Sequence, residues 1–590
     1  MKVVIIGAGP AGLVACKSLL ENADDAYPFD PVVLEQETAI GGTFRYRSYE
    51  NAALVSSKQL TSFSDFRLPL SHPDHLTLEE YVEYLEAYAQ HFDLNKRIQL
   101  KTKVLNVRRD PKGGHIVSYT RFDGSGTSNR GSAIQTMHAQ YLIVCTGLHV
   151  IPSIPSIPGV EHLAAQTPPV KVFHSHEYKT RSQFEGKRVM ILGTGETGMD
   201  LAYESAKAGA KEVVLCTRAG FLSFPKALND FEVLGYRFDD EKKVPIDSLI
   251  TNLAETAYVH PWVAASHIRW FVSDFVIKRL LWVLTGTQAG CNQWVGELEP
   301  ERLGRAYVFL NKSHKAMPYI NRPFRKRAPL LDYMSRYMDP PEDSPPQTDF
   351  AVDLAPFPTS FLPNGRAVFP NLERKDAKRI MGRDIRPEIV VFATGYQQDF
   401  SMLDPESNYP TPDQASIRNI TREGDEDIAF IGFVRPGVGA IPPIAEMQTL
   451  FWISLIKGQV RQPLPPAHYH LLVKESARIK YGVDHSTYMS TLAKDIGAAP
   501  GLWQTWWEHG AHVLLCYCFG AAFTSFYRLT GPYKSPLAPE VVKTEIWDTI
   551  TRRGWVGNIV MGLIPMIFYL SLNSLAYVAA TVWVACGGDS

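Results

Sequence analysis

The sequence has 590 residues, which is too long for a single hydrophobic core and suggests roughly three to five domain-sized units. Its 60 Lys and Arg residues balance 61 Asp and Glu residues, so the charge gives no reason to expect a nucleic-acid partner. The 7 cysteines are scattered without a Cys-x-x-Cys pair or the spacing of zinc ligands, which argues against a disulfide framework, a dithiol reductase and a zinc site.

The first predicted strand, residues 2–6, runs into a glycine-rich turn and then into a predicted helix. In such a strand–turn–helix the first glycine permits the tight turn, the second lets a pyrophosphate approach the backbone, and the third lets the helix pack against the strand. The helix N-terminus offers N–H groups and a partial positive charge to the pyrophosphate. A second strand ends in an acidic residue, whose carboxylate can bind both ribose hydroxyls. The pattern predicts a dinucleotide site formed by Gly7, Gly9, Pro10, Ala11, Gly12 and Glu35.

The next stretch of the chain contains four recognisable segments. Residues 78–92 have helical spacing, residues 98–141 alternate like a small antiparallel meander, and residues 141–147 form a buried strand ending in a sharp turn. The proline-rich segment 151–159 is too broken for a helix or a central strand, and it predicts a domain boundary.

The opening pattern returns after this boundary. A predicted strand, residues 188–192, precedes a second turn with Gly193, Gly195, Thr197 and Gly198, and the following strand ends at Arg218. An acidic residue would repel a 2′-phosphate, whereas an arginine can pair with one, so this site favours NADPH. The alternative is that Arg218 is a solvated strand end. Two different fingerprints predict FAD followed by NADPH, and hydride transfer requires the second domain to be inserted in the first.

Residues 219–350 have a less regular pattern. Residues 267–284 predict a helix rich in aromatic and basic residues, which fits either a membrane surface or an ordinary core. A basic cluster at 322–327 and an acidic, proline-rich linker at 339–346 fit solvated loops, although lipid headgroups would also suit the basic cluster. The sheet pattern resumes at 388–396 and 428–432. A helix beginning near Pro442 then offers its N-terminus to negative charge on a reduced flavin.

The tail is predicted to lie in a membrane. Residues 554–588 contain no charged residue, and residues 559–585 are long and apolar enough to cross a bilayer. Arg552 and Arg553 precede this segment, which indicates a tail anchor with the catalytic part in the cytosol. No signal peptide precedes the first strand, in agreement with this location. A buried core helix is the alternative, and the shorter apolar run 513–527 is interpreted as buried or interfacial.

These motifs together resemble the flavin-containing monooxygenases, which are class B flavoproteins of the membrane-anchored type. The resemblance extends from Gly7 to the tail. Besides the two fingerprints it rests on Gly41-Gly42-Thr43-Phe44, Ser57-Lys58, Phe63-x-Asp65-Phe66, His174-Ser175-x-x-Tyr178, Phe184-x-Gly186-Lys187-Arg188-Val189, Ala393-Thr394-Gly395-Tyr396, Pro443-x-x-Glu446-x-Gln448 and Arg528-Leu529-Thr530-Gly531-Pro532.

The resemblance implies an enzyme similar to N,N-dimethylaniline monooxygenase in the endoplasmic reticulum membrane. In this cycle NADPH reduces FAD, O2 forms a flavin hydroperoxide, and one oxygen passes to a nucleophilic nitrogen or sulfur. The cofactor carries the chemistry, so no catalytic acid, base or nucleophile is assigned. The resemblance adds these residues to the cofactor sites: Gly42, Thr43, Phe44, Val55, Ser56, Asp200, Thr394, Gly395 and Gln448.

Two positions depart from the family pattern. Pro168 and Val170 replace a phenylalanine and a glycine in the motif that ends at His174. Val55 stands where the family usually has an asparagine close to the flavin and nicotinamide. An amide can donate a hydrogen bond there and an isopropyl group cannot. Either another residue, such as Ser56, supplies this hydrogen bond, or the enzyme releases peroxide instead of transferring oxygen.

The predicted fold class is α/β, with two Rossmann-like dinucleotide domains, the NADPH domain inserted in the FAD domain, and a C-terminal transmembrane helix. The expected divisions are 1–165 and 397–460 for FAD, 166–218 and 351–396 for NADPH, 219–350 for a mostly helical insert, 461–553 for a helical region and 557–586 for the anchor.

Other functions stay open at this point. One is Baeyer–Villiger oxygenation of a ketone, which the His174…Tyr178 ending of the motif disfavours. Another is an NADPH oxidase or quinone-type reductase, which Val55 suggests. A third is a membrane-tethered binding or scaffold protein with vestigial nucleotide sites. The expected partners are a small-molecule substrate, O2 and, through the tail, a lipid bilayer. The substrate and the oligomeric state, including a homo-oligomer, cannot be read from the sequence.

Overall fold

The computed structural model describes most of the chain. The described residues are 1–122, 133–228, 231–233, 236–238, 243–250, 259–271, 274–275, 279, 296, 298, 310–317, 319–320, 351–472 and 481–587.

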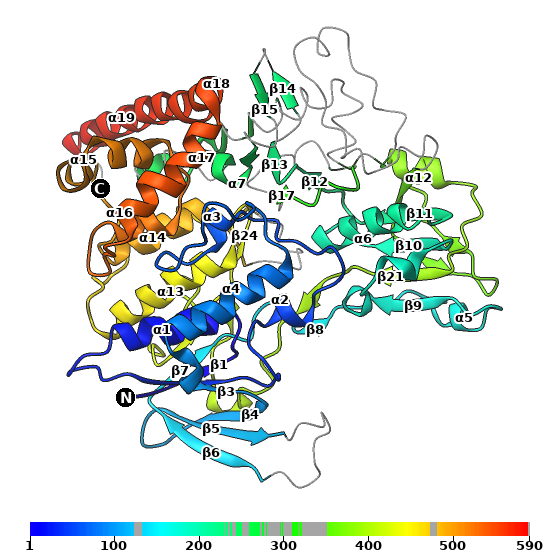
Figure 1. Cartoon of the computed structure of the whole chain (residues 1–590), viewed down its shortest axis with the longest axis horizontal. Helices are drawn as coiled ribbons and strands as arrows, with labels where there is room; N and C mark the ends of the chain where they lie inside the picture. The colour runs from blue at the N-terminus through cyan, green and yellow to red at the C-terminus, as the bar shows by residue number, and fades with distance from the viewer. Residues whose placement is uncertain are drawn as a thin grey trace.

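A five-stranded parallel sheet forms the centre of the first lobe (Figure 1). Its strand order is β23-β7-β1-β2-β3, and the central register pairs Ile5 of β1 with Val33 of β2 and Ile143 of β7. Apart from β3, whose two residues are half-buried, these strands are short apolar runs, buried on both faces as parallel strands usually are. Their bounds are β1 (Lys2–Ile6), β2 (Asp30–Leu34), β3 (Ile98–Gln99), β7 (Tyr141–Val144) and β23 (Ile428–Phe430).

Two layers cover this sheet (Figure 1). Helices α1 (Pro10–Glu21) and α13 (Ile441–Ile456) pack with α4 (Leu78–His91) into one core. The small antiparallel sheet β4 (Thr102–Arg109), β5 (His115–Arg121) and β6 (Gln135–Ala139) packs on the other face. The predicted meander is thereby confirmed, except that its first residues join the parallel sheet as β3.

A second five-stranded parallel sheet has the order β18-β11-β10-β21-β9. All its strands lie in the sequence between β7 and β23, so this sheet is inserted into the first one. Its helix α6 (Glu196–Lys207) follows β10 directly, as α1 follows β1. The bounds are β9 (Lys171–His174), β10 (Arg188–Leu192), β11 (Glu212–Thr217), β18 (Val352–Pro356) and β21 (Ile389–Phe392).

The expectation of a mostly helical insert at 219–350 stays a prediction, because much of this segment lies outside the described residues. Its described part contains paired short strands, among them β12 (Leu222–Ser223) with β17 (Leu310–Asn311), and short helices such as α8 (Pro261–Ala264). Helical spacing in one segment, 267–284, motivated the expectation, and two-residue strands have no readable periodicity. Of that segment, η5 (His267–Trp270) and four further residues are described. The basic cluster 322–327 and the acidic linker 339–346 lie outside the described residues.

The C-terminal region packs several helices against the first lobe (Figure 1). Helix α15 (Leu502–Phe519) is interrupted at Gly510, whose φ is +85°, and it buries Val513, Cys516 and Tyr517. Among the described residues one helix, Gly554–Ala585, is long and apolar enough to cross a membrane. Its last part, α19 (Ile564–Ala585), turns one face toward the protein and leaves the other exposed.

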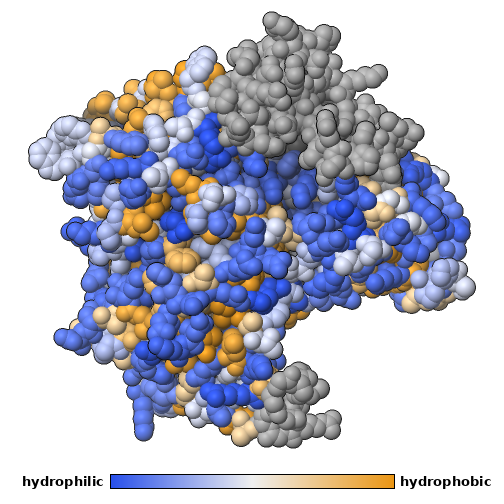
Figure 2. Space-filling view, in the orientation of Figure 1, coloured by the Kyte–Doolittle hydropathy of each residue, from blue (hydrophilic) through white to orange (hydrophobic). Residues whose placement is uncertain are grey.

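Two polar contacts hold the inner face of α19. The Tyr569 hydroxyl donates to the Arg269 carbonyl over 2.6 Å, and the His260 N–H donates to Asn573 Oδ1 over 2.8 Å. The outer face is apolar, and Figure 2 shows hydrophobic side chains gathered over this corner of the molecule. Large apolar residues that are exposed on this helix include Leu570, Leu575, Val578, Val582 and Trp583.

Candidate functional site

The turn after β1 has the geometry that its glycines predict. Gly7 has a φ of +107°, and an added Cβ would lie 2.7 Å from the Cys145 carbonyl oxygen. A Cβ on Gly12 would lie 1.9 Å from the Gly7 carbonyl oxygen, so α1 can approach the strand only with glycine there. A Cβ on Gly9 would meet only Gly42 Cα, at 3.9 Å. The described contacts would therefore allow a side chain at the middle glycine, and the space that glycine leaves open is available to a ligand.

The N-terminus of α1 faces this turn without a capping side chain. Pro10 occupies the first helical position, followed by Ala11, and the first turn contains no acidic residue. The positive end of the helix dipole is therefore uncompensated by the helix's own side chains, which favours an anion at this end.

Glu35 is held beside the turn by two backbone donors. Its Oε2 accepts from the Ala8 N–H over 2.6 Å and its Oε1 from the Glu37 N–H over 2.9 Å. Burial raises the pKa of this carboxyl, while the two N–H groups oppose that rise. The arrangement fixes the acidic group predicted to bind a ribose.

A second glycine turn lies against the first. Gly42 has a φ of +55°, and its backbone faces that of Gly9, since an added Cβ would lie 3.2 Å from Gly9 Cα. Thr43 begins the short helix α2 (Thr43–Tyr46), and Phe44 packs edge-on against Tyr81 at a centroid distance of 4.7 Å. These three residues are thus brought to the same turn as Gly9.

The segment around Val55 links this lobe to residues far along the chain. Ser56 Oγ is hydrogen-bonded to Thr61 Oγ1 at 2.7 Å, so its hydroxyl is already engaged. The Ser57 N–H donates to Asp247 Oδ2 over 2.7 Å. Val55 itself lines a small pocket together with residues of the inserted lobe.

The turn after β10 repeats the geometry of the first. Gly193 has a φ of +123°, and a Cβ there would lie 2.3 Å from the Ala393 carbonyl oxygen. A Cβ on Gly198 would lie 2.0 Å from the Gly193 carbonyl oxygen, whereas one on Gly195 would meet nothing within 4 Å. The middle glycine again leaves room for a ligand, at the start of α6, where Thr197 lies in the first turn.

Two acidic side chains of α6 are bound by residues of the insert. Half-buried Glu196 accepts from the N–H groups of Lys312, over 2.9 Å, and Ser313, over 2.7 Å. Burial raises the pKa of Glu196. Asp200 accepts from the Tyr49 hydroxyl over 2.7 Å and from the Ser313 hydroxyl. Position 196 is a variable position of the glycine fingerprint, so the sequence alone does not predict these contacts.

Arg218 follows the last residue of β11 at the same end of the sheet as the second turn. Its exposed guanidinium lies over the Phe357 ring at 4.7 Å. Among the described residues no carboxylate lies within ion-pair distance of it. The neighbouring Arg374 donates to the Arg218 carbonyl over 2.5 Å, but its own charge is paired with Asp376.

Thr394, Gly395 and Gln448 take part in contacts within the protein. The Thr394 hydroxyl donates to the Ser153 carbonyl, and the Gly395 carbonyl oxygen lies 2.9 Å from His174 Nε2. These two residues therefore join the second sheet to the connector between the lobes.

Gln448 is fully buried within α13. Its Oε1 accepts from the Gly432 N–H over 2.8 Å, and its Nε2 donates to the Tyr488 hydroxyl over 2.9 Å. Both ends of its amide are engaged, so it holds the turn after β23 in place.

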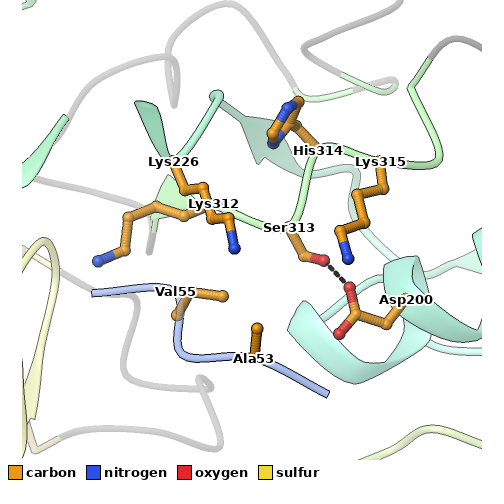
Figure 3. Close-up of a pocket in the computed structure, with 8 residues that line it drawn as sticks. All are labelled: Ala53, Val55, Asp200, Lys226, Lys312, Ser313, His314 and Lys315. Carbon is orange, nitrogen blue, oxygen red and sulfur yellow. Dashed lines mark hydrogen bonds between the residues drawn. The ribbon is translucent and has the colours of Figure 1, made fainter. Parts of the chain in front are cut away.

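The pocket beside Val55 collects basic residues that the sequence analysis did not single out (Figure 3). They come from the insert, where no local motif surrounds them, and only the tertiary fold brings them together. Its lining residues are Ala53, Val55, Asp200, Lys226, Lys312, Ser313, His314 and Lys315.

The residues present fit two dinucleotides. Each turn has one glycine whose Cβ would fill open space in front of an uncapped helix N-terminus, as described above for Gly9 and Gly195. The strand ends differ as the two ligands require. A fixed carboxylate follows β2, and β11 is followed by Arg218, which has no carboxylate partner among the described residues.

Comparisons with known proteins agree with this geometry. The family model for flavin-binding monooxygenase-like proteins matches residues 1–271 and 381–581. Monooxygenase PC-14 of Penicillium crustosum is 40% identical, over 96% of this chain and 96% of its own. N-oxide-forming dimethylaniline monooxygenase 2 of Pan troglodytes is 26% identical, over 90% of this chain and 89% of its own.

The structure of S-allyl-L-cysteine S-oxygenase from Allium sativum shares the fold, with a TM-score of 0.50 at 16% identity, over 84% of this chain and 88% of that one. Its two-domain Rossmann-type architecture is the one predicted from the two fingerprints. The chain belongs to the flavin-binding monooxygenase-like family, whose enzymes use FAD and NADPH.

Proposed function

We propose that this enzyme transfers one oxygen atom from O2 to a nucleophilic nitrogen or sulfur of a small organic molecule. The observation that carries the proposal is the pair of glycine turns, each open at its middle glycine, with a pocket between the lobes that Val55 and Asp200 both line. The name of the N-oxide-forming relative supports the same substrate chemistry.

The first turn is proposed to bind FAD. Gly9 and Gly42 leave the backbone accessible to the pyrophosphate, the N-terminus of α1 faces its charge, and Glu35 accepts the ribose hydroxyls. When bound, FAD and NADPH supply the redox and oxygen-transfer chemistry. The protein's own part is to orient both ligands and to keep water from the reacting atoms.

The second turn is proposed to bind NADPH. Gly195 admits the pyrophosphate, and Arg218 pairs with the 2′-phosphate from its position over Phe357. Thr394 and Gly395 fix the connector between the lobes, so they hold the two ligand sites at a constant distance.

A second candidate function is an NADPH oxidase. It is favoured by Val55 and Ala53, which line the pocket with groups that cannot donate a hydrogen bond from their side chains. The Ser56 hydroxyl is hydrogen-bonded to Thr61, so it can replace the missing donor only where Thr61 donates in that pair.

The chemistry can be tested with purified, FAD-loaded enzyme, NADPH, ¹⁸O2 and panels of tertiary amines, thioethers and ketones. We expect one ¹⁸O atom in an N-oxide or S-oxide, with NADPH consumed in equal amount. Ester formation from ketones would instead indicate Baeyer–Villiger chemistry. NADPH consumption with stoichiometric peroxide and no labelled product would refute oxygen transfer and leave the oxidase.

We also propose that the enzyme is tail-anchored in the endoplasmic reticulum membrane, with its catalytic part in the cytosol. The exposed apolar face of α19 supports lipid contact. Exposed tryptophans on α15, Trp503 and Trp507, add amphipathic side chains of the kind found at membrane interfaces. Carbonate washing of cell membranes tests the proposal, because a tail-anchored enzyme stays with the lipid and a peripheral one is released.

A further inference from the structure

A concentration of positive charge lies in the pocket between the two lobes (Figure 3). Lys226, Lys312, Lys315 and His314 line it, and Asp200 is the acidic side chain of the lining. Asp200 already accepts two protein hydroxyls, so much of its capacity is used. The cavity has a volume of about 10 Å³, which is room for one water-sized group.

The backbone around Lys312 is fixed over the second glycine turn. Strand β17 pairs with β12, and the Asn311 amide donates to the Thr194 carbonyl over 2.9 Å. The N–H groups of Lys312 and Ser313 then bind the Glu196 carboxylate. These contacts use backbone and neighbouring groups, not the Lys312 side chain, and they fix the position from which that side chain extends.

The Lys312 ammonium group is buried and has no hydrogen-bond partner in the part of the chain that the structure describes. Its residue is 4% exposed, and the closest carboxylate oxygen, Asp247 Oδ2, is 3.9 Å away. That oxygen already accepts the Ser57 N–H. A buried ammonium group without hydrogen bonds is costly, and an anionic ligand would supply the missing acceptors.

Burial and neighbouring charges change the pKa values of two side chains in the pocket, Lys226 and His314. Burial and the charges of Lys315 and Lys243 lower the pKa of Lys226 to about 8, while Asp200 and Glu196 act in the opposite direction. Burial and Lys226 lower the pKa of His314 to about 4, so that ring is neutral at pH 7. At pH 7 Lys226 therefore remains largely protonated beside the small cavity.

We propose that this pocket binds an anionic oxygen group, a carboxylate or a phosphate, carried by the organic substrate or by NADPH. The pocket lies where Val55 of the FAD-binding lobe meets Asp200 of α6, so this inference rests on the proposed function. Lys312 and Lys226 contact the anion directly, and the cavity, with room for one water-sized group, admits a single oxygen atom of the carboxylate or phosphate. A charged end group held there fixes one end of the ligand beside Val55.

Inorganic phosphate and NADP⁺ are the probes of this site. Their dissociation constants are measured calorimetrically on FAD-loaded wild-type enzyme and on the variants Lys312→Met, Lys226→Met and Lys312→Arg. Lys211→Met is the control, because Lys211 is exposed and lies beyond the C-terminal end of α6, whereas the pocket lies near its N-terminal end. Retained FAD shows that each variant is folded.

We expect phosphate binding to weaken at least tenfold in both methionine variants and to recover in Lys312→Arg, with Lys211→Met unchanged. If NADP⁺ binding weakens in parallel, the dinucleotide supplies the anion; if NADP⁺ binding stays unchanged, the substrate supplies it. Phosphate and NADP⁺ constants within twofold of wild type in both methionine variants would overturn the inference. An enzyme that binds phosphate here but gives only peroxide would keep the inference and lose the proposed function.

Discussion

Replacing Arg218 by alanine tests the assignment of the second turn to NADPH. The guanidinium lies over Phe357, is exposed and has no carboxylate partner among the described residues, so its charge is available to a 2′-phosphate. Two unit charges 4 Å apart attract by about 1 kcal/mol in bulk water and about 4 kcal/mol at a protein surface of lower dielectric. Solvent screening at this exposed position reduces the upper value to about 2 kcal/mol, which corresponds to about 30-fold in affinity.

The assay compares kcat/KM for NADPH and for NADH, which lacks the 2′-phosphate. We expect Arg218→Ala to lower the NADPH value about 30-fold and to leave the NADH value nearly unchanged, with a smaller effect at high salt. Arg188→Ala is the control, because Arg188 begins β10 and lies at the opposite end of the sheet. An equal loss with both nucleotides, or no loss with either, would refute the pairing and leave Arg218 as a solvated strand end.

The same structure leads to three further predictions. Gly195→Ala should keep the melting temperature and the FAD content but lose NADP⁺ binding by calorimetry, because its Cβ would meet no described atom within 4 Å. Gly12→Ala should instead lose FAD and lower the melting temperature, because its Cβ would clash with backbone. Sulfate, whose charge is constant above neutral pH, should bind the lysine pocket more weakly as pH rises through about 8 and Lys226 loses its proton; unchanged affinity between pH 7 and 9 would contradict this role. Removing residues 554–590 should release the enzyme from membranes while flavin absorbance per protein stays constant, and loss of flavin on truncation would show that this helix supports the fold instead.

Local geometry explains which parts of the site could be predicted from sequence. An added Cβ would overlap backbone at Gly7, Gly12, Gly193 and Gly198. Gly7 and Gly193 also have a positive φ, so the glycine pattern could be recognised from the sequence. The residues that end the strands, such as Glu35, follow from the same short motif.

The rest of the site depends on contacts between distant residues. Lys226 and Lys312 meet because β12 pairs with β17, and strands of two residues have no recognisable periodicity. Glu196 occupies a variable position of the fingerprint, yet it anchors the segment that carries the lysines. Gln448 follows the family motif, but only the structure shows that both ends of its amide are used.

The insertion of one sheet into the other has a consequence for synthesis on the ribosome. Strand β23 completes the first sheet beside β7, but it is translated only after the whole second lobe. At about 5–20 residues per second, the apolar edge of β7 stays unpaired for on the order of half a minute. Unpaired edges recruit other chains. The nascent enzyme is therefore expected to depend on chaperones during this interval, and slowing translation between the two strands should increase its aggregation.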